Sequence, residues 1–222
     1  MTLKESVFFA FATDAINYFG ARRKLGDELV DNVDVVLQVG IKTDGGIAMI
    51  LGVKKTGKKG VMISAVDLLK GIAVGAEMKV IEVEGADGTL HTNYEGKAQA
   101  AVDALLKDDY DFAYIHVEAP DEMGHQGSLE RKLKAIEFLD ERVIKVVKEQ
   151  MDASGVEYRM LVTPDHPTPI AIRTHSSDPI PFLLYDSTRQ RRRIGFYNEK
   201  EAMESGIVVE DGYEMIEKLL ED

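Results

Sequence analysis

The segment Phe112-Ala-Tyr-Ile-His-Val117-Glu-Ala-Pro-Asp121-Glu-Met-Gly-His125 sets the architecture of this chain. Its first six residues form an apolar run typical of a buried strand, and a carboxylate and an imidazole follow closely. A second segment repeats the arrangement: the apolar residues 160–162 precede Thr163-Pro-Asp165-His166, and His175 comes nine residues further on. Ligands of an open α/β sheet gather where its strands end. We therefore expect the two Asp/His groups to converge at one edge of a sheet.

The residue types in these two groups indicate a divalent-metal site. Carboxylate and imidazole donors, in a chain without cysteine, suit Mn²⁺ or Zn²⁺ rather than iron–sulfur chemistry. Two other interpretations stay open. Asp121 and His125 could belong to a loop with a capped helix start, and Asp165-His166, held between prolines, could be a rigid turn. His116 lies inside the first apolar run and is interpreted as a packed histidine or a donor to a ligand, not as a ligand.

Short apolar runs that alternate with helical periodicity predict an α/β sandwich with a mostly parallel sheet and helices on both faces. The expected strands are 61–64, 79–83, 112–117, 160–162 and 182–185, and the expected helices are 93–106, 129–147 and 212–220. In the second helix, apolar residues at three- and four-residue steps predict one buried stripe: Leu129, Leu133, Ile136, Leu139, Val143 and Val147. Residues 7–18 fit either a helix or a strand, and 33–39 with 47–53 fit a hairpin.

Composition narrows the class of protein. The chain has 222 residues, 45% of them hydrophobic, which suffices for one α/β domain with or without a small appendage. A net charge of −12 argues against nucleic acid as a partner. No apolar run approaches the length of a membrane span, and the N-terminus lacks the pattern of a secretory signal. From the first of these observations we expect no membrane partner. The absence of cysteine excludes a disulfide framework, so we expect a cytoplasmic protein. The basic run 189–193 is interpreted as a solvated turn rather than a phosphate clamp.

Six strings carry a family resemblance: 60–72, 84–88, 92–97, 116–127, 163–169 and 174–181. In this order and at this spacing they resemble the archaeal-type branch of the cofactor-independent phosphoglycerate mutases, within the alkaline phosphatase superfamily. The resemblance concerns the C-terminal half of such an enzyme. It implies an alkaline-phosphatase-like sandwich whose N-terminal portion is incomplete or rearranged. Residues 1–55 would then be an unmatched segment, and residues 56–222 the C-terminal part of the metal-binding domain.

The resemblance also implies a chemistry. Family members are glycolytic isomerases that interconvert 3- and 2-phosphoglycerate, a small phosphorylated acid, through a phosphoserine and two divalent metals. The metals are Mn²⁺, Zn²⁺, Co²⁺ or Mg²⁺. By motif position, Asp121, His125 and His175 would hold the substrate-side metal, while Asp165 and His166 would bind the nucleophile-side metal. At least one of the two sites is expected to be retained in this chain.

Other polar residues in the matched strings are candidates for substrate binding. Thr92 and Asn93 lie in a matched loop, and Lys97 lies at a helix start, where it could contact phosphate or carboxylate or remain solvated. His91 is expected on the surface. Ser64 lies in a matched segment where the family does not place its nucleophile, so we do not assign it that role.

The first 55 residues lack the family's Asp-Gly-x-x-Asp motif and its nucleophilic serine. The nearest match, Asp44-Gly45-Gly46 after residues 33–39, lacks the second aspartate and is typical of a hairpin turn. Three functions remain open. The chain could be a phosphoglycerate mutase homologue or a fragment of one, poorly active by itself. It could be another metal-dependent phosphotransferase or phosphohydrolase of the superfamily. It could also be a catalytically silent metal-binding domain.

Overall fold

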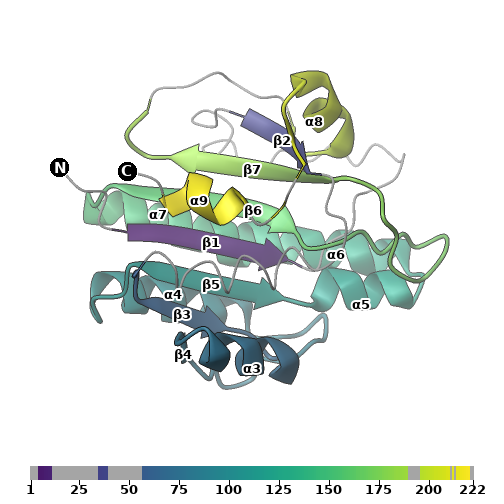
Figure 1. Cartoon of the computed structure of the whole chain (residues 1–222). Coiled ribbons are helices and arrows are strands. Elements are labelled where there is room, and N and C mark those ends of the chain that lie inside the picture. The colour runs from purple at the N-terminus through teal and green to yellow at the C-terminus, as the bar shows by residue number, and fades with distance from the viewer. Residues whose placement is uncertain are drawn as a thin grey trace.

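A single twisted sheet forms the centre of the molecule (Figure 1). The structure, a computed structural model, describes residues 5–11, 35–39, 57–189, 196–210, 212 and 214–220. Within these residues the sheet has eight strands in the order β4-β3-β5-β1-β6-β7-β2-β8. Their bounds are β1 Glu5–Phe11, β2 Val35–Val39, β3 Gly60–Ile63, β4 Lys79–Val80, β5 Phe112–Val117, β6 Tyr158–Pro164, β7 Ile180–Asp186 and β8 Val208–Val209.

The sheet is mostly parallel, as the sequence predicts. Among the described strands, β7 alone runs against its neighbours, pairing antiparallel with both β6 and β2. Every residue of β5 and β6 is buried, which matches the near-continuous apolar runs of a parallel sheet covered on both faces. The carboxyl ends of β3, β5, β1 and β6 therefore point to the same edge.

Helices cover both faces of the sheet (Figure 1). They are α3 Asp67–Gly75, α4 Tyr94–Leu106, α5 Ala119–His125, α6 Leu129–Leu139, the π-helix η1 Asp140–Ile144, α7 Lys145–Ser154, α8 Glu199–Ser205 and α9 Glu214–Leu220. Successive residues of β5 enter two different cores. Ala113 and Ile115 belong to the core beneath α4 and α7, whereas Phe112 and Tyr114 belong to the core beneath α3 and α9. This is the period-two alternation of a strand between two layers.

The first 55 residues contribute two strands to the same sheet. β1 lies between β5 and β6, with Ala10 opposite both His116 and Thr163. Within 7–18, the residues up to Phe11 are thus strand, and residues 12–18 lie outside the described part. β2 pairs with β7 and β8. The partner predicted for its hairpin, 47–53, and the Asp44-Gly45-Gly46 turn also lie outside the described residues.

Two elements differ from the sequence-based prediction. The expected strand 79–83 pairs with its neighbour over Lys79–Val80, and the chain then turns at Gly85, where φ is +73°. The expected helix 129–147 runs on to Ser154 and contains the π-helix η1. Of its predicted buried stripe, Leu139, Val143 and Val147 are buried, Leu133 and Ile136 are partly buried, and Leu129 is 41% exposed. Helix α6 packs against α5.

In the part of the chain that the structure describes, no helix has both the length and the apolar character needed to cross a membrane.

Candidate metal centre

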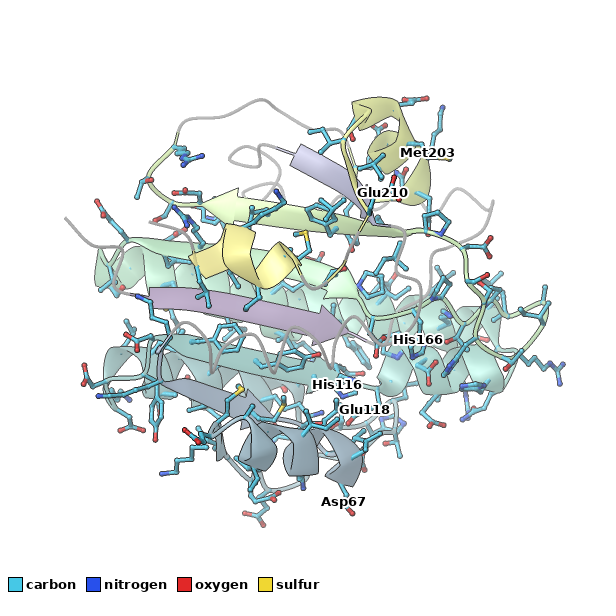
Figure 2. All side chains as sticks on the ribbon, in the orientation of Figure 1. Asp67, His116, Glu118, His166, Met203 and Glu210 are labelled. Atoms are coloured by element: carbon cyan, nitrogen blue, oxygen red, sulfur yellow. The ribbon has the colours of Figure 1, made fainter. Side chains whose placement is uncertain are left out.

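The first Asp/His group lies on α5, which begins directly after β5. Glu118 separates the end of the strand from Ala119, and Pro120 occupies the first turn of the helix, where its missing N–H costs nothing. Asp121 and His125 are four residues apart and therefore lie one turn apart on the same face of α5. The second group follows β6 and lies in the loop that leads to β7. Figure 2 shows His116, Glu118 and His166 near the arrowheads of β5 and β6, at one edge of the sheet.

Asp121, His125 and His175 come together as one potential ligand set. The Nε2 atoms of the two histidines are 3.2 Å apart. His125 Nε2 lies 3.4 Å from Asp121 Oδ2, and His175 Nε2 lies 3.6 Å from Asp121 Oδ1. Ligand atoms on one tetrahedral ion with bonds near 2.1 Å would be about 3.4 Å apart. With one ligand atom from each residue, the three donors lie within 4.8 Å of one another, close enough to converge on one Zn²⁺- or Mn²⁺-sized ion.

The main chain fixes which nitrogen of His125 is available. His125 Nδ1 lies 3.0 Å from the carbonyl oxygen of Arg173, which can only accept a hydrogen bond. Nδ1 must therefore carry the proton, so Nε2 retains its lone pair and faces Asp121 and His175. Arg173 adopts a left-handed conformation, with φ +55°, to present this carbonyl. Partial burial and the neighbouring His166 lower the pKa of His175, which favours its neutral, metal-binding form.

Asp165 and His166 form a second, smaller group. Asp165 Oδ1 accepts a hydrogen bond from the main-chain N–H of His166 at 3.0 Å and lies 3.5 Å from its Nε2. The His166 ring stacks on His175 with centroids 3.7 Å apart, so the two groups are adjacent. Burial raises the pKa of Asp165, although His166 and His116 act in the opposite direction. A nearby cation would stabilise the charged form of this buried carboxylate. Asp165 and His166 could therefore supply two ligands to a second ion.

A buried polar cluster lies behind the ligands. Lys97 Nζ, which is fully buried, donates to the His116 carbonyl at 2.8 Å and to Glu118 Oε2 at 3.0 Å. Ser64 Oγ and Glu118 Oε1 both lie 3.3 Å from the same ring atom, His116 Nδ1. A relay through a histidine needs its two partners on opposite ring nitrogens. Ser64, His116 and Glu118 are therefore a packing cluster here, not a nucleophile and its base.

The three predicted substrate contacts have internal partners. Thr92 is buried, and its hydroxyl accepts a hydrogen bond from the Asp87 N–H at 3.0 Å. Asn93 caps α4 by accepting from Gly96 N at 2.9 Å, and its amide donates to the Glu84 carbonyl at 2.8 Å. Thr92 and Asn93 thus hold the start of α4 to the loop at 84–87, and the buried Lys97 ties α4 to the end of β5. Contact with a substrate stays a prediction for all three. His91 is exposed, as expected.

Sequence reasoning missed two residues beside the ligands. Thr168 is fully buried, and its hydroxyl donates a hydrogen bond to Asp121 Oδ1. Lys132 is buried on α6 and donates to the Thr168 carbonyl at 2.9 Å. Burial lowers the pKa of Lys132 to about 7, while the charge of Glu199 acts against this shift. The available signal was the pair of prolines around Thr168, which restricts the backbone on both sides.

Comparisons with known proteins show the family to which the chain belongs. A family model described as the metalloenzyme superfamily matches residues 46–211, starting upstream of the boundary expected at residue 56. The probable 2,3-bisphosphoglycerate-independent phosphoglycerate mutase of Geobacter sulfurreducens is 49% identical over 169 residues, 76% of this chain and 42% of that protein. The corresponding mutase of Methanosarcina acetivorans is 51% identical over 150 residues, which are 68% of this chain and 37% of that protein. The chain thus spans about two fifths of the length of these curated relatives.

Two solved structures resemble the fold over nearly the whole chain. The PH0037 protein of Pyrococcus horikoshii superposes with a TM-score of 0.81 at 17% identity, covering 99% of this chain and 96% of that one. The alkaline phosphatase of the Antarctic bacterium TAB5 superposes with a TM-score of 0.62 at 12% identity, covering 99% of this chain and 97% of that one. These likenesses concern the fold alone. The chain therefore belongs to the metalloenzyme superfamily, has an alkaline-phosphatase-like fold, and is homologous over about three quarters of its length to cofactor-independent phosphoglycerate mutases.

Proposed function

We propose that this chain is a divalent-metal phosphotransfer domain whose substrate is a small phosphorylated acid. The observation that carries the proposal is the convergence of Asp121, His125 and His175, each of which offers a ligand atom within 4.8 Å of the other two. The names of the homologous mutases supply the substrate class. The cysteine-free composition and the net charge of −12 support a cytoplasmic protein that does not bind nucleic acid.

Each ligand has a distinct part in the proposal. Asp121, His125 and His175 hold the first ion, and Asp165 with His166 contributes to a second. When bound, such ions neutralise the charge of a phosphoryl group and polarise it towards attack. The protein's own contribution is to orient the donors: the Arg173 carbonyl holds the proton of His125 on Nδ1, and the stacking of His166 on His175 keeps the two groups adjacent.

Calorimetric titration with MnCl₂ and ZnCl₂ tests the metal site. We expect close to one tight ion per chain at neutral pH, with affinity reduced at least about tenfold in His125→Ala. The exposed His91→Ala is the matched control and should bind as the wild type does. Affinity should fall as pH drops below about 6.5, because protonated imidazole cannot donate its lone pair. Absence of binding at pH 7.5 would refute the proposal.

Activity assays separate the mutase from its two alternatives. Since the sequence contains no match to the nucleophilic serine of the family, we expect no robust conversion of 3-phosphoglycerate to 2-phosphoglycerate in an enolase-coupled assay with Mn²⁺. Faint hydrolysis of p-nitrophenyl phosphate that disappears in His125→Ala would favour the phosphohydrolase. Metal binding without either activity would favour the silent domain. Turnover of about 1 per second or more in the coupled assay would instead establish a competent mutase, with Ser6 and Thr13 the first positions to test.

A further inference from the structure

Thr168 lies between the two Asp/His groups and contacts a member of each. Its hydroxyl donates to Oδ1 of Asp121, a ligand of the first proposed ion. The same oxygen lies 3.3 Å from Nδ1 of His166, a ligand of the second. The Thr168 side chain is fully buried, so these contacts are shielded from competing water. Thr168 is thus a hydrogen-bonded link between the two groups.

The chemistry of the three groups determines where each proton lies. An ionised carboxylate only accepts hydrogen bonds, so the hydroxyl proton of Thr168 points to Asp121. The hydroxyl oxygen then accepts, and the partner available to it is an N–H on His166 Nδ1. With the proton on Nδ1, the lone pair of His166 is on Nε2, the atom 3.5 Å from Asp165. Asp121 in turn keeps Oδ2 available beside His125.

We propose that Thr168 is a positioning residue that couples the two metal sites. Through one hydroxyl it sets the carboxylate orientation of Asp121 and the tautomer of His166, so that Oδ2 and Nε2 face the ions. The inference deepens the proposed function and rests on it as far as metal is concerned. The proton positions on Thr168 and His166 are the same in the metal-free protein.

The position of Thr168 is fixed by a second set of contacts. Lys132 Nζ on α6 donates to the Thr168 carbonyl at 2.9 Å. A Cβ at Gly124 on α5 would lie 2.5 Å from that carbonyl oxygen and 2.7 Å from Lys132 Nζ, so only glycine lets the three segments meet. The prolines at 167 and 169 further limit the backbone. These contacts hold the Thr168 main chain, and its hydrogen bonds to Asp121 and His166 orient the hydroxyl before any metal binds.

Two substitutions at this position separate the hydroxyl from the volume of the side chain. Thr168→Val keeps the shape and removes the hydroxyl, whereas Thr168→Ser keeps the hydroxyl. We expect Thr168→Val to weaken Mn²⁺ or Zn²⁺ binding by about 10- to 100-fold in calorimetry. Thr168→Ser should recover most of this loss. Equal affinity of Thr168→Val and wild type would overturn the coupling role.

Nitrogen-15 NMR of the histidine rings gives a readout that needs no metal. In the metal-free wild type at pH 7.5, we expect His166 to carry its proton on Nδ1, and Thr168→Val to lose that preference. A wild-type His166 protonated on Nε2 would overturn the proposal without any variant, even if Thr168→Val failed to fold. If the wild type binds no ion but shows the Nδ1 tautomer that Thr168→Val loses, the proposed function fails while the positioning role stands.

Discussion

At the scale of single residues, Glu118 is a buried carboxylate whose pKa is strongly lowered by its neighbours. Burial alone would raise the pKa of Glu118, but hydrogen bonds and charges from His116 and Lys97 outweigh burial and lower it to about 2. For Lys97 the balance differs, because burial lowers its pKa more than Glu118 raises it. The folded environment thus favours the charged form of Glu118 but disfavours the charged form of Lys97. The net contribution of the pair is smaller than the shift of Glu118 alone suggests.

This pair predicts a defined acid sensitivity. Because the folded-state pKa of Glu118 is depressed, its contribution is present above pH 4.5 and is lost as pH falls from about 4.5 to about 2. Glu118→Gln should remove this part of the pH dependence. It should also lower the free energy of unfolding at pH 7 by about 3 kcal/mol, since Lys97 stays buried without its counter-charge. Urea denaturation at several pH values measures both effects.

The control for Glu118→Gln lies on the surface of α4. Asp103 pairs with Lys107 at 2.8 Å, and both side chains are more than a third exposed. Asp103→Asn should change the free energy of unfolding by no more than about 0.5 kcal/mol. A Glu118→Gln loss as small as that of Asp103→Asn would mean that the buried pair contributes nothing net.

A second prediction at this scale separates the backbone of Arg173 from its side chain. A left-handed conformation costs a residue with a Cβ about 1 to 2 kcal/mol, a cost that glycine avoids. Arg173→Gly should therefore keep the carbonyl that orients His125 and leave Zn²⁺ affinity near the wild-type value. Arg173→Val, with a β-branched side chain, should resist φ +55° and weaken binding. Calorimetric titration with Zn²⁺ measures the affinity of both variants. Equal losses of affinity would show that the guanidinium of Arg173, not its carbonyl, supports binding.

At the scale of elements, the π-helix η1 keeps a long helix in register with the sheet. Leu139, Val143, Val147 and Met151 are buried at four-residue steps. In a regular α-helix such positions drift by about 40° per step, because each residue advances about 100°. The wider turn of η1 takes up this drift, as a π-bulge that accommodates one extra residue does.

We therefore predict that deletion of Glu141 is tolerated. Removing this exposed residue from η1 should convert the bulge into regular α-helix while leaving Leu139 and Val147 on the buried face. Deletion of Lys134, exposed in the regular helix α6, is the matched control. It should rotate Lys132 and the start of α6 by about 100° relative to the rest and destabilise the fold. Thermal unfolding followed by circular dichroism compares the two; equal stability losses would contradict the role given to η1.

At the scale of the whole molecule, the proposed metal centre would tie together elements that are distant in sequence. Its ligands come from α5 and from the loop between β6 and β7, and the loop is held by Lys132 of α6. An ion that binds the folded chain alone stabilises all of it. At 100 times its dissociation constant, the stabilisation is about 2.7 kcal/mol. For a chain of this size, that corresponds to a rise in Tm of about 5 to 10 °C.

Differential scanning fluorimetry with and without ZnCl₂ measures this shift. We expect the rise in Tm for the wild type and for His91→Ala, and little or no rise for His125→Ala and His175→Ala. An equal rise in all four proteins would indicate adventitious surface binding and would contradict the assigned ligands.

The sequence by itself determined the local elements and the ligand types. The prediction of strand 112–117 matches the structure to the residue, because a short run rich in aromatic and β-branched residues between polar residues favours a buried strand. That Asp121 and His125 lie one turn apart on a helix is a finding of the structure, because the sequence alone left this segment open. The Asp/His groups were expected to meet because parallel strands end at the same edge.

Tertiary structure decided the rest. The placement of β1 between β5 and β6 pairs residues more than 100 positions apart, and no local periodicity encodes such a choice of partner. The roles of Thr168, Lys132 and Lys97 depend on which atoms face them after folding. Their residue types, considered alone, suggest surface positions. Hydrogen-bond partners and burial are properties of the packed chain, so only the folded arrangement could show that a threonine links the two ligand groups.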